Sequence, residues 1–209
     1  MVGLLQLFVV EVRQAAREST MVFMLIVLGI LVVALIYFIS LYNNLVQLKN
    51  SVAQMWANID VLLKQRHDEL PKLVEVCKQY KQFERETLQG VIAARSQVQV
   101  AREGQDVAAL GKAEGVMRAS LGNLFAVAEA YPELKTNEQF MLLQTRIIGL
   151  ENGIADRREL YNDTVNINNV AIEQFPSVLV ANMFNFTTKP LLEFSVAEKA
   201  DVDIKSLFA

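Results

Sequence analysis

The chain has 209 residues, of which 53% are hydrophobic, and a formal net charge of −3 at pH 7. This length suits one domain with its own core, and the mixing of acidic and basic residues leaves no basic stripe, so nucleic acid is not an expected partner. Cys77 is the only cysteine, which excludes an intrachain disulfide and a thiolate metal site within one copy. We expect it to be a buried apolar thiol.

Residues 1–20 are predicted to form a short amphipathic helix that lies on a membrane surface. Apolar residues recur there at helical spacing, whereas Gln6, Arg13 and Arg17 fall on another side. Phe8, Arg13 and Arg17 are therefore candidate contacts with lipid or with a partner.

Residues 21–42 are predicted to form a transmembrane anchor. The run "MVFMLIVLGILVVALIYFI", Met21 to Ile39, holds no charge and as a helix would reach roughly 28 Å, the thickness of a bilayer core. The helical pattern continues into "SLYNNLV", which favours an uncleaved anchor. Arg13 and Arg17 precede the span, so the positive-inside bias places the N-terminus in the cytoplasm and the main domain outside.

Residues 43–176 are predicted to form a helical bundle that grows directly out of the anchor. No glycine or proline occurs between Ile30 and Leu70, so no residue is expected to interrupt the helix there. Apolar residues then alternate at spacings of four and three, which is typical of helices packed nearly parallel to a neighbour: Leu41, Leu45, Leu48, Val52, Met55, Ile59 and Leu62. Trp56 is a candidate contact residue in this stretch.

The stretch "KQRHDELPKL", residues 64–73, predicts a turn between helices. Pro71 has no amide hydrogen for the carbonyl of His67, which favours the end of a helix. Arg66 and His67 would then lie at a helix C-terminus and Asp68 just before the next N-terminus, the order of charges that helix dipoles favour. No metal ligand lies one helical turn from His67, so a turn is favoured over catalysis.

Three further long helices are expected at about residues 71–103, 105–130 and 137–174. Gly104, Pro132 and Pro176 are predicted to mark the ends of these helices. Thr136 and Gln139 are predicted to form a capping box at the start of the last one. Gly111 is one of several small residues in the second of these helices that would let a neighbour approach closely.

Polar residues on the apolar seams are expected to be buried with partners and to fix the register between helices: Arg66, Asn168 and, less strongly, Glu151 and Arg157. Residues 177–209 form an apolar piece and a tail, with Phe184 and Phe186 as candidate contacts. Since no segment alternates with period two, the fold class is all-α, a transmembrane helix that continues into an antiparallel bundle of about four long helices.

Three blocks of sequence resemble the LemA family of bacterial membrane proteins. They are "YNNLVQLKNSVAQMWANIDVLLKQRHDELPKLVEVCKQY", "AEAYPELKTNEQFMLLQTRI" and "ENGIADRRELYNDTVNINNVAIEQFP". With the anchor they extend over nearly all of residues 21–195. The resemblance implies a bacterial cell membrane protein with one span and a helical bundle.

The chain departs from that family pattern in three places. The first twenty residues are an addition, Ile167 stands where the family favours a tyrosine, and Asn185–Phe186 replaces a "GF" pair. The family pattern names no catalytic residue, so none is carried over, and no metal or cofactor is expected.

The sequence leaves two classes of function open. The favoured hypothesis is a membrane-anchored scaffold or adaptor that binds lipid, itself or another membrane protein and has no small-molecule substrate. The alternative is a membrane-bound hydrolase with a site where charged residues near the turns converge: Asp68, Glu69, Glu133, Lys135 and Glu138. A pore would require oligomerisation, because the span holds no charged or amide residue to line a water path.

Overall fold

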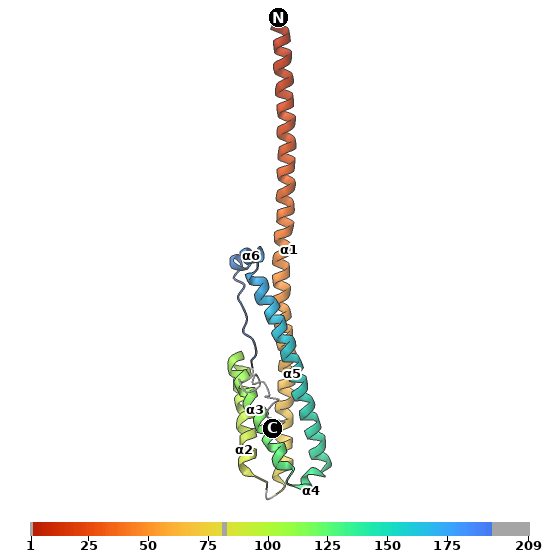
Figure 1. The fold of residues 1–209 in the computed structure, drawn as a ribbon, viewed down its shortest axis with the longest axis vertical. Coiled ribbons are helices and arrows are strands. Elements are labelled where there is room, and N and C mark those ends of the chain that lie inside the picture. The colour runs from red at the N-terminus through yellow and green to blue at the C-terminus, as the bar shows by residue number, and fades with distance from the viewer. Residues whose placement is uncertain (1, 81–82, 194–209) are drawn as a thin grey trace, which may run out of the picture.

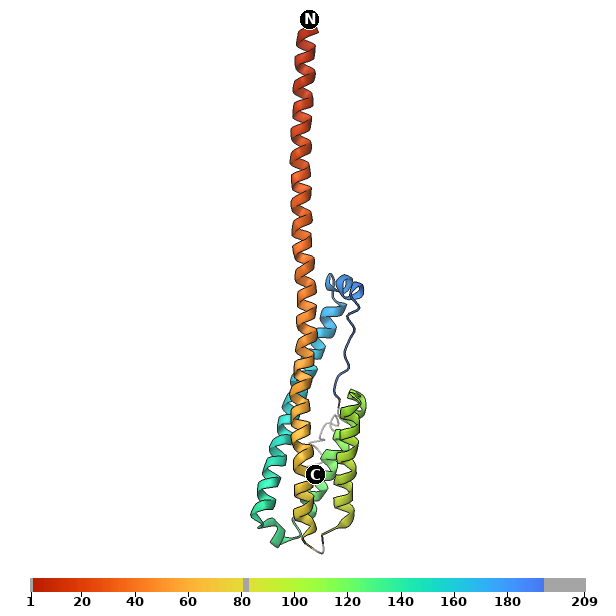
Figure 2. The ribbon, with the colours of Figure 1, turned by 180° about the vertical axis from the view of Figure 1, so that it is seen from behind.

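The computed structural model describes residues 2–80 and 83–193, and for residues 2–16, 18 and 19 it describes the backbone alone. These residues form helices α1 to α6 and no strand, which confirms the all-α class (Figure 1). Four of the helices are long, and the two views in Figures 1 and 2 show a bundle from which one helix projects far beyond the others.

Helix α1 (Val2–Lys78) has 77 residues and belongs both to the projecting shaft and to the bundle. At 1.5 Å per residue it is about 115 Å long. The side chains from Met21 to Leu35 are all exposed, and this is the one helix in the described part of the chain that is long and apolar enough to cross a membrane. Its side chains are apolar and none of them is buried in the described bundle, as expected of a helix segment that lies in lipid.

The backbone of residues 2–20 continues straight into the span (Figure 1). The predicted position of residues 1–20 on a membrane surface stays a prediction, and the described backbone shows no bend between this segment and the span. The reason is local: between Gly3 and Gly29 the sequence holds no proline or glycine, so the helix has no residue at which to break.

The predicted turn at Pro71 is wrong, because α1 passes through this proline and ends at Lys78. Pro71 itself is exposed, so its ring faces solvent. The carbonyl of His67, which loses its helical partner, accepts a hydrogen bond from Arg95 Nε at 3.0 Å. Apolar residues continue on the buried face on both sides of the proline, at Leu70, Leu73, Val74 and Cys77, so packing holds the helix together.

The connection to the next helix begins only after Lys78, and Phe83 in this connection is buried against the core. Helix α2 (Arg85–Glu103) is therefore shorter than predicted, and α3 (Val107–Ala128) follows it antiparallel. A single-turn helix α4 (Pro132–Lys135) leads into α5 (Glu138–Glu173), which returns along α1, and α6 (Ser177–Met183) follows. Helices α1 and α5 form one extensive pair, and α2 and α3 form the other.

Two of the described helices, α3 and α5, begin at a short polar side chain that caps them. Asp106 accepts a hydrogen bond from the amide of Ala109 at the start of α3, and Asn137 accepts one from the amide of Phe140 at the start of α5. The predicted capping box of Thr136 and Gln139 is wrong, because Thr136 donates its hydroxyl to the carbonyls of Pro132 and Glu133. Asn137 is the N-cap of α5, because it has the extended backbone conformation that an N-cap residue requires.

The buried side chains form two clusters. The larger one fills the bundle between α1, α2, α3 and α5. The smaller one lies where the bundle meets the span and consists of Leu45, Ile172, Val180 and Ala181. It holds α6 against α1 and α5, just after Pro176, the N-cap of α6.

Candidate functional site

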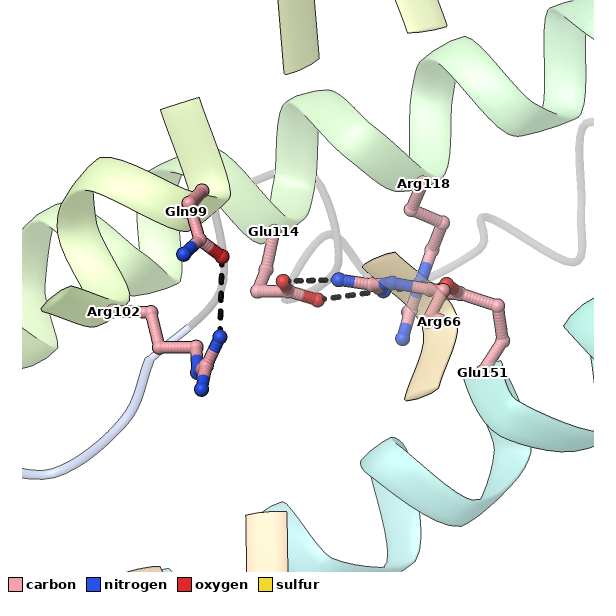
Figure 3. Close-up of polar contacts among 6 residues, drawn as sticks. All are labelled: Arg66, Gln99, Arg102, Glu114, Arg118 and Glu151. Carbon is pink, nitrogen blue, oxygen red and sulfur yellow. Dashed lines mark hydrogen bonds and ion pairs between the residues drawn. The ribbon is translucent and has the colours of Figure 1, made fainter. Parts of the chain in front are cut away.

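A buried ionic network joins three helices in the bundle interior (Figure 3). Arg66 of α1 donates two hydrogen bonds to the carboxylate of Glu114 on α3, with N–O distances of 2.9 and 2.5 Å. It donates a third, of 2.5 Å, to Glu151 on α5, which also lies 3.9 Å from Arg118. The network ties the α1–α5 pair to the α2–α3 pair.

Burial and charge act in opposite directions on Arg66, whose side chain is 1% exposed. Burial lowers the pKa of its guanidinium, but the carboxylates of Glu114 and Glu151 outweigh this effect and raise the pKa above its usual value. Arg66 is thus a permanent buried cation held by two acidic partners. This arrangement agrees with the expectation that Arg66 and Glu151 fix the register between helices. The sequence did not predict Glu114 as a buried partner, because its neighbours in the sequence include alanine and glycine and it lies on no recognised polar seam.

His67 points toward α2. Arg95 Nη2 lies 2.6 Å from His67 Nε2, in addition to its bond to the His67 carbonyl, so one arginine holds both the ring and the backbone beside Pro71. Burial and the charge of Arg95 lower the pKa of His67, which favours a neutral ring. The only histidine of the chain therefore supports the helix rather than a metal or a reacting group.

The residues of the hydrolase alternative are not brought together at one end. Asp68 and Glu69 lie in the interior of α1, about ten residues and hence about 15 Å from its distal end, where Glu133, Lys135 and Glu138 lie around α4. Glu69 pairs instead with Lys72, at 3.0 Å. In the described part of the chain, no group of three or more His, Cys, Asp and Glu residues is placed to hold a metal ion.

The Asn-rich stretch of α5 binds the chain that follows α6. The side chain of Asn169 donates to the carbonyl of Lys189 and accepts from its amide, and Asn162, two turns away, does the same with Leu192. Tyr161 donates its hydroxyl to the carbonyl of Pro190. The segment 186–193 is thereby fixed alongside α5, with Leu192 buried in the main core.

This same segment passes close to α3 at Gly111. A Cβ atom at Gly111 would lie 2.0 Å from the carbonyl oxygen of Glu193. The prediction that Gly111 allows a close approach is therefore confirmed, with the extended segment as the neighbour. Asn168, also predicted to be buried, is 2% exposed, while Arg157 lies on the exposed side of α5.

Aromatic side chains gather where the span enters the bundle. Phe184 contacts the rings of Tyr42 and Phe38, with centroid distances of 4.7 and 6.3 Å, and Phe186 contacts Tyr42 at 6.0 Å. Phe184 remains 47% exposed. Among these residues, Tyr42 is of the type enriched at the membrane–water boundary, because its ring is apolar and its hydroxyl is polar.

The backbone explains why Asn185 stands between these two phenylalanines. Its φ is 56°, in the left-handed region that glycine and asparagine occupy most readily, and the amide of Phe186 bonds the carbonyl of Ala181. This is the Schellman ending of α6, in which Asn185 takes the position usually held by glycine. The replacement of "GF" by "NF" therefore preserves the local structure.

The remaining candidate contact residues have different environments. Trp56 packs partly against the core and lies 5.7 Å, centroid to centroid, from the ring of Tyr161. Arg17 is exposed on the shaft. The side chains of Phe8 and Arg13 lie outside the described part of the structure.

An open apolar groove of about 580 Å³ runs between α2 and α3 on the outside of the bundle. Its lining includes small and β-branched residues, among them Ala93, Ser96, Val100, Ala109, Ala113 and Val116. Val100 and Val116 are exposed, at 68% and 46%. This face has the apolar character of a contact surface for another helix.

Comparison with known proteins gives one family and several distant relatives. A sequence model described as "LemA family" matches residues 55–205. Protein LemA of Metamycoplasma hominis is 26% identical, with 88% of this chain and 84% of that protein aligned. Magnetosome protein MamQ of Magnetospirillum gryphiswaldense is 24% identical over 88% of this chain and 76% of its own length, and Magnetosome protein MamQ 2 of Paramagnetospirillum magneticum is 25% identical over 83% and 73%.

Proposed function

This chain belongs to the LemA family, and we propose that it is a membrane-anchored helical scaffold or adaptor that acts through protein–protein contacts and self-association. The proposal assigns it no catalytic residue, cofactor or small-molecule substrate. Its place is the bacterial cell membrane, as a single-pass protein whose N-terminus faces the cytoplasm.

The observation that carries the proposal is the continuity of α1. One helix serves as the span and as a core element of the bundle, where Arg66 connects it to α3 and α5. A rigid element of this kind holds the bundle at a fixed distance from the membrane and in a fixed orientation. A bundle surface held at a constant distance from the membrane suits the docking of another protein. Docking of this kind requires no catalytic groups.

The groove between α2 and α3 is the contact face that we propose for self-association. Because α1 sets the height of the bundle, each copy in one membrane carries this groove at the same level, so the grooves of neighbouring copies can meet. Two identical faces then form a two-fold contact about an axis along the membrane normal. Alanine-rich linings allow helices to approach closely, and Val100 and Val116 provide apolar area to bury.

The test is the mass of the complex extracted from native membranes in a mild detergent. We expect a discrete assembly that contains at least two copies, and the double variant Val100→Asp/Val116→Asp should reduce it to a single copy. Ile148→Asp is the matched control, since Ile148 is 44% exposed on α5 outside the groove. A single copy in the wild type, with or without a bound second protein, or equal loss in the control, would refute the proposed contact.

The orientation has its own test. Lys64 is exposed in the bundle portion of α1, so a Lys64→Cys variant can be labelled by a thiol reagent that does not cross membranes. Cys77 does not interfere, because burial raises the pKa of its thiol to about 12 and keeps it unreactive. Labelling in intact cells supports a bundle outside the cytoplasm, and labelling only after lysis contradicts it.

A further inference from the structure

A second hollow lies at the junction of the span, α6 and the bundle, and we call it the membrane-proximal cavity. It has a volume of about 370 Å³. Tyr42, Lys49 and Asn50 of α1 form one wall, Asn168 of α5 lies inside it, and the chain after α6 closes it with residues that include Phe186 and Lys189.

The lining of the membrane-proximal cavity is positively charged and rich in hydrogen-bond donors. Lys49 and Lys189 contribute two ammonium groups, while none of the lining residues is acidic. Neither ammonium forms an ion pair with a carboxylate in the described part of the chain. Side-chain amides add donors at Asn50 and Asn185, while the amide of Asn168 donates to the side-chain oxygen of Asn169 at 3.2 Å. Lysine ammonium and amide N–H groups match the oxygens of a phosphate.

The position of the cavity places it at the membrane surface. Its upper rim is formed by Tyr42 and Phe184, directly after the lipid-exposed span. Leu179 and Met183, one helical turn apart on α6, expose apolar side chains at 61% and 57%, and Phe175 in the preceding turn is 81% exposed. Figure 1 shows α6 beside α1 at the membrane end of the bundle. An exposed apolar face at this level is explained if it contacts the boundary of the bilayer.

The ammonium groups of the two lysines lie within reach of a lipid headgroup. Tyr42 and Lys49 are separated by about 10 Å along α1, and the headgroup layer of one leaflet is about 5 to 7 Å thick. The flexible stems of Lys49 and Lys189 can carry their ammonium groups the remaining way toward the bilayer, as lysines near membranes do.

From these observations we propose that the membrane-proximal cavity binds the phosphate-bearing headgroup of an anionic phospholipid. The two lysines and the amides hold the phosphate, the aromatic rim meets the upper part of the lipid, and the acyl chains remain in the bilayer beside the span. This site goes beyond the general membrane contact of the anchor, because it selects a lipid by its charge.

The proposal is tested by native mass spectrometry of the full chain in a mild detergent, titrated with phosphatidylglycerol or phosphatidylcholine. We expect one phosphatidylglycerol retained per chain and clear preference over phosphatidylcholine. The variant Lys49→Gln/Lys189→Gln should weaken that binding about thirtyfold, from the usual attraction of two lysines to an anionic membrane surface. Lys49→Arg/Lys189→Arg should restore it, which separates charge from any effect on folding.

The matched control is Lys64→Gln/Lys72→Gln, which removes two exposed lysines of α1 farther from the membrane. It should leave the binding of phosphatidylglycerol unchanged. Equal retention of both lipids, or equal loss in the control, would overturn the site. Inorganic phosphate that binds as tightly as phosphatidylglycerol would indicate a soluble anion site and would overturn the lipid assignment.

Discussion

Arg66 is the residue on which the joining of the two helix pairs depends. Its guanidinium satisfies Glu114, which is as buried as Arg66 itself, together with the partly buried Glu151. Removing one member of such a group leaves charge buried without a partner, which costs more than the intact group contributes.

We therefore expect Arg66→Met to lower the free energy of unfolding by about 3–5 kcal/mol, measured by chemical denaturation of the detergent-solubilised chain. Arg66→Met/Glu114→Leu/Glu151→Leu should recover most of the loss, because no isolated charge then remains. Arg102→Met is a control, since the side chain of its partner Asp60 is 39% exposed and keeps contact with solvent. If the triple variant were no more stable than the single one, the network would have another role.

His67 makes stability depend on pH. Its folded pKa is lowered by burial and by Arg95, while Asp68 and Glu103 oppose the shift only in part. The unfolded chain therefore takes up a proton at a higher pH than the folded chain does. Above about pH 6.5 His67 is neutral in both the folded and the unfolded chain, so it does not change the free energy of unfolding. Below that pH the unfolded chain binds the proton more readily, and the folded state loses stability.

The expected result is a melting temperature that falls between pH 7 and pH 5, with a smaller fall in His67→Gln. Glutamine keeps a hydrogen-bond acceptor for Arg95 but does not titrate. Thermal unfolding followed by circular dichroism at a series of pH values measures the difference. An identical pH dependence in the variant would show that His67 does not contribute.

Helices α2 and α6 both end with a residue in the left-handed backbone conformation, and substitutions at these two residues test whether that conformation is strained. At the end of α2, Gln105 has φ 51°, and the amide of Asp106 bonds the carbonyl of Ala101, so Gln105 occupies the position that Asn185 occupies after α6. Glutamine is strained there by about 1 kcal/mol relative to glycine.

Accordingly Gln105→Gly should raise the free energy of unfolding by up to about 1 kcal/mol, whereas Asn185→Gly should be nearly neutral. Asn185→Val should lower it by about 1–2 kcal/mol, because a β-branched residue resists positive φ. Thermal unfolding of the three variants measures the order of their stabilities. A destabilised Gln105→Gly would contradict the assignment of strain.

Pro71 shows what local sequence reasoning could and could not provide. The loss of a hydrogen bond at the His67 carbonyl follows from the residue type alone. Its replacement by Arg95, 28 positions away, does not, because it depends on how α2 packs against α1. The continuation of the apolar face from Leu70 to Cys77 was the one local sign that the helix would persist.

Among the elements, the segment 186–193 depends on two helices at once. Asn162 and Asn169 of α5 hold its backbone, and Gly111 of α3 leaves the space that it occupies. Alanine in place of glycine normally stabilises a helix interior by about 1 kcal/mol. At Gly111 the added methyl group would collide with the carbonyl of Glu193, so the usual gain should be reversed.

We expect Gly111→Ala to lower the melting temperature and to increase hydrogen exchange at Leu192. Gly122→Ala on the same helix is the control, because a Cβ atom there meets nothing within 4 Å. It should raise stability. If both variants raised it, segment 186–193 would not be held against α3 as described.

The long helices were predictable where both ends carry local signals. Helix α5 was expected at about residues 137–174 and has its caps at Asn137 and Gln174. Helix α2 was placed too early because its start was assigned to Pro71. The path of segment 186–193 was not predictable, since paired side-chain-to-backbone bonds leave no periodic pattern in the sequence.

At the scale of the whole molecule, one helix joins the candidate span to the bundle. α6 and its aromatic neighbours lie where that helix enters the bundle, and Arg66 connects it to α3 and α5. The number and type of helices followed from periodicity. Their grouping into an α1–α5 pair and an α2–α3 pair depends on long-range packing that a single sequence does not specify.

The most direct test of this account is a distance measured by pulsed electron paramagnetic resonance across the junction of span and bundle. Ser40 and Gln65 are exposed on α1, and spin labels at Ser40→Cys and Gln65→Cys are separated by 25 residues, or about 37 Å along a continuous helix. Asn44→Pro, which interrupts the helix between the labels, is the control for sensitivity.

In lipid nanodiscs the account predicts one narrow distribution near this distance, and a broader one in the Asn44→Pro variant. A wild-type distribution as broad as that of the proline variant, or one with a second, shorter distance, would show a hinge between span and bundle. It would contradict the claim that α1 holds the bundle rigidly on the membrane.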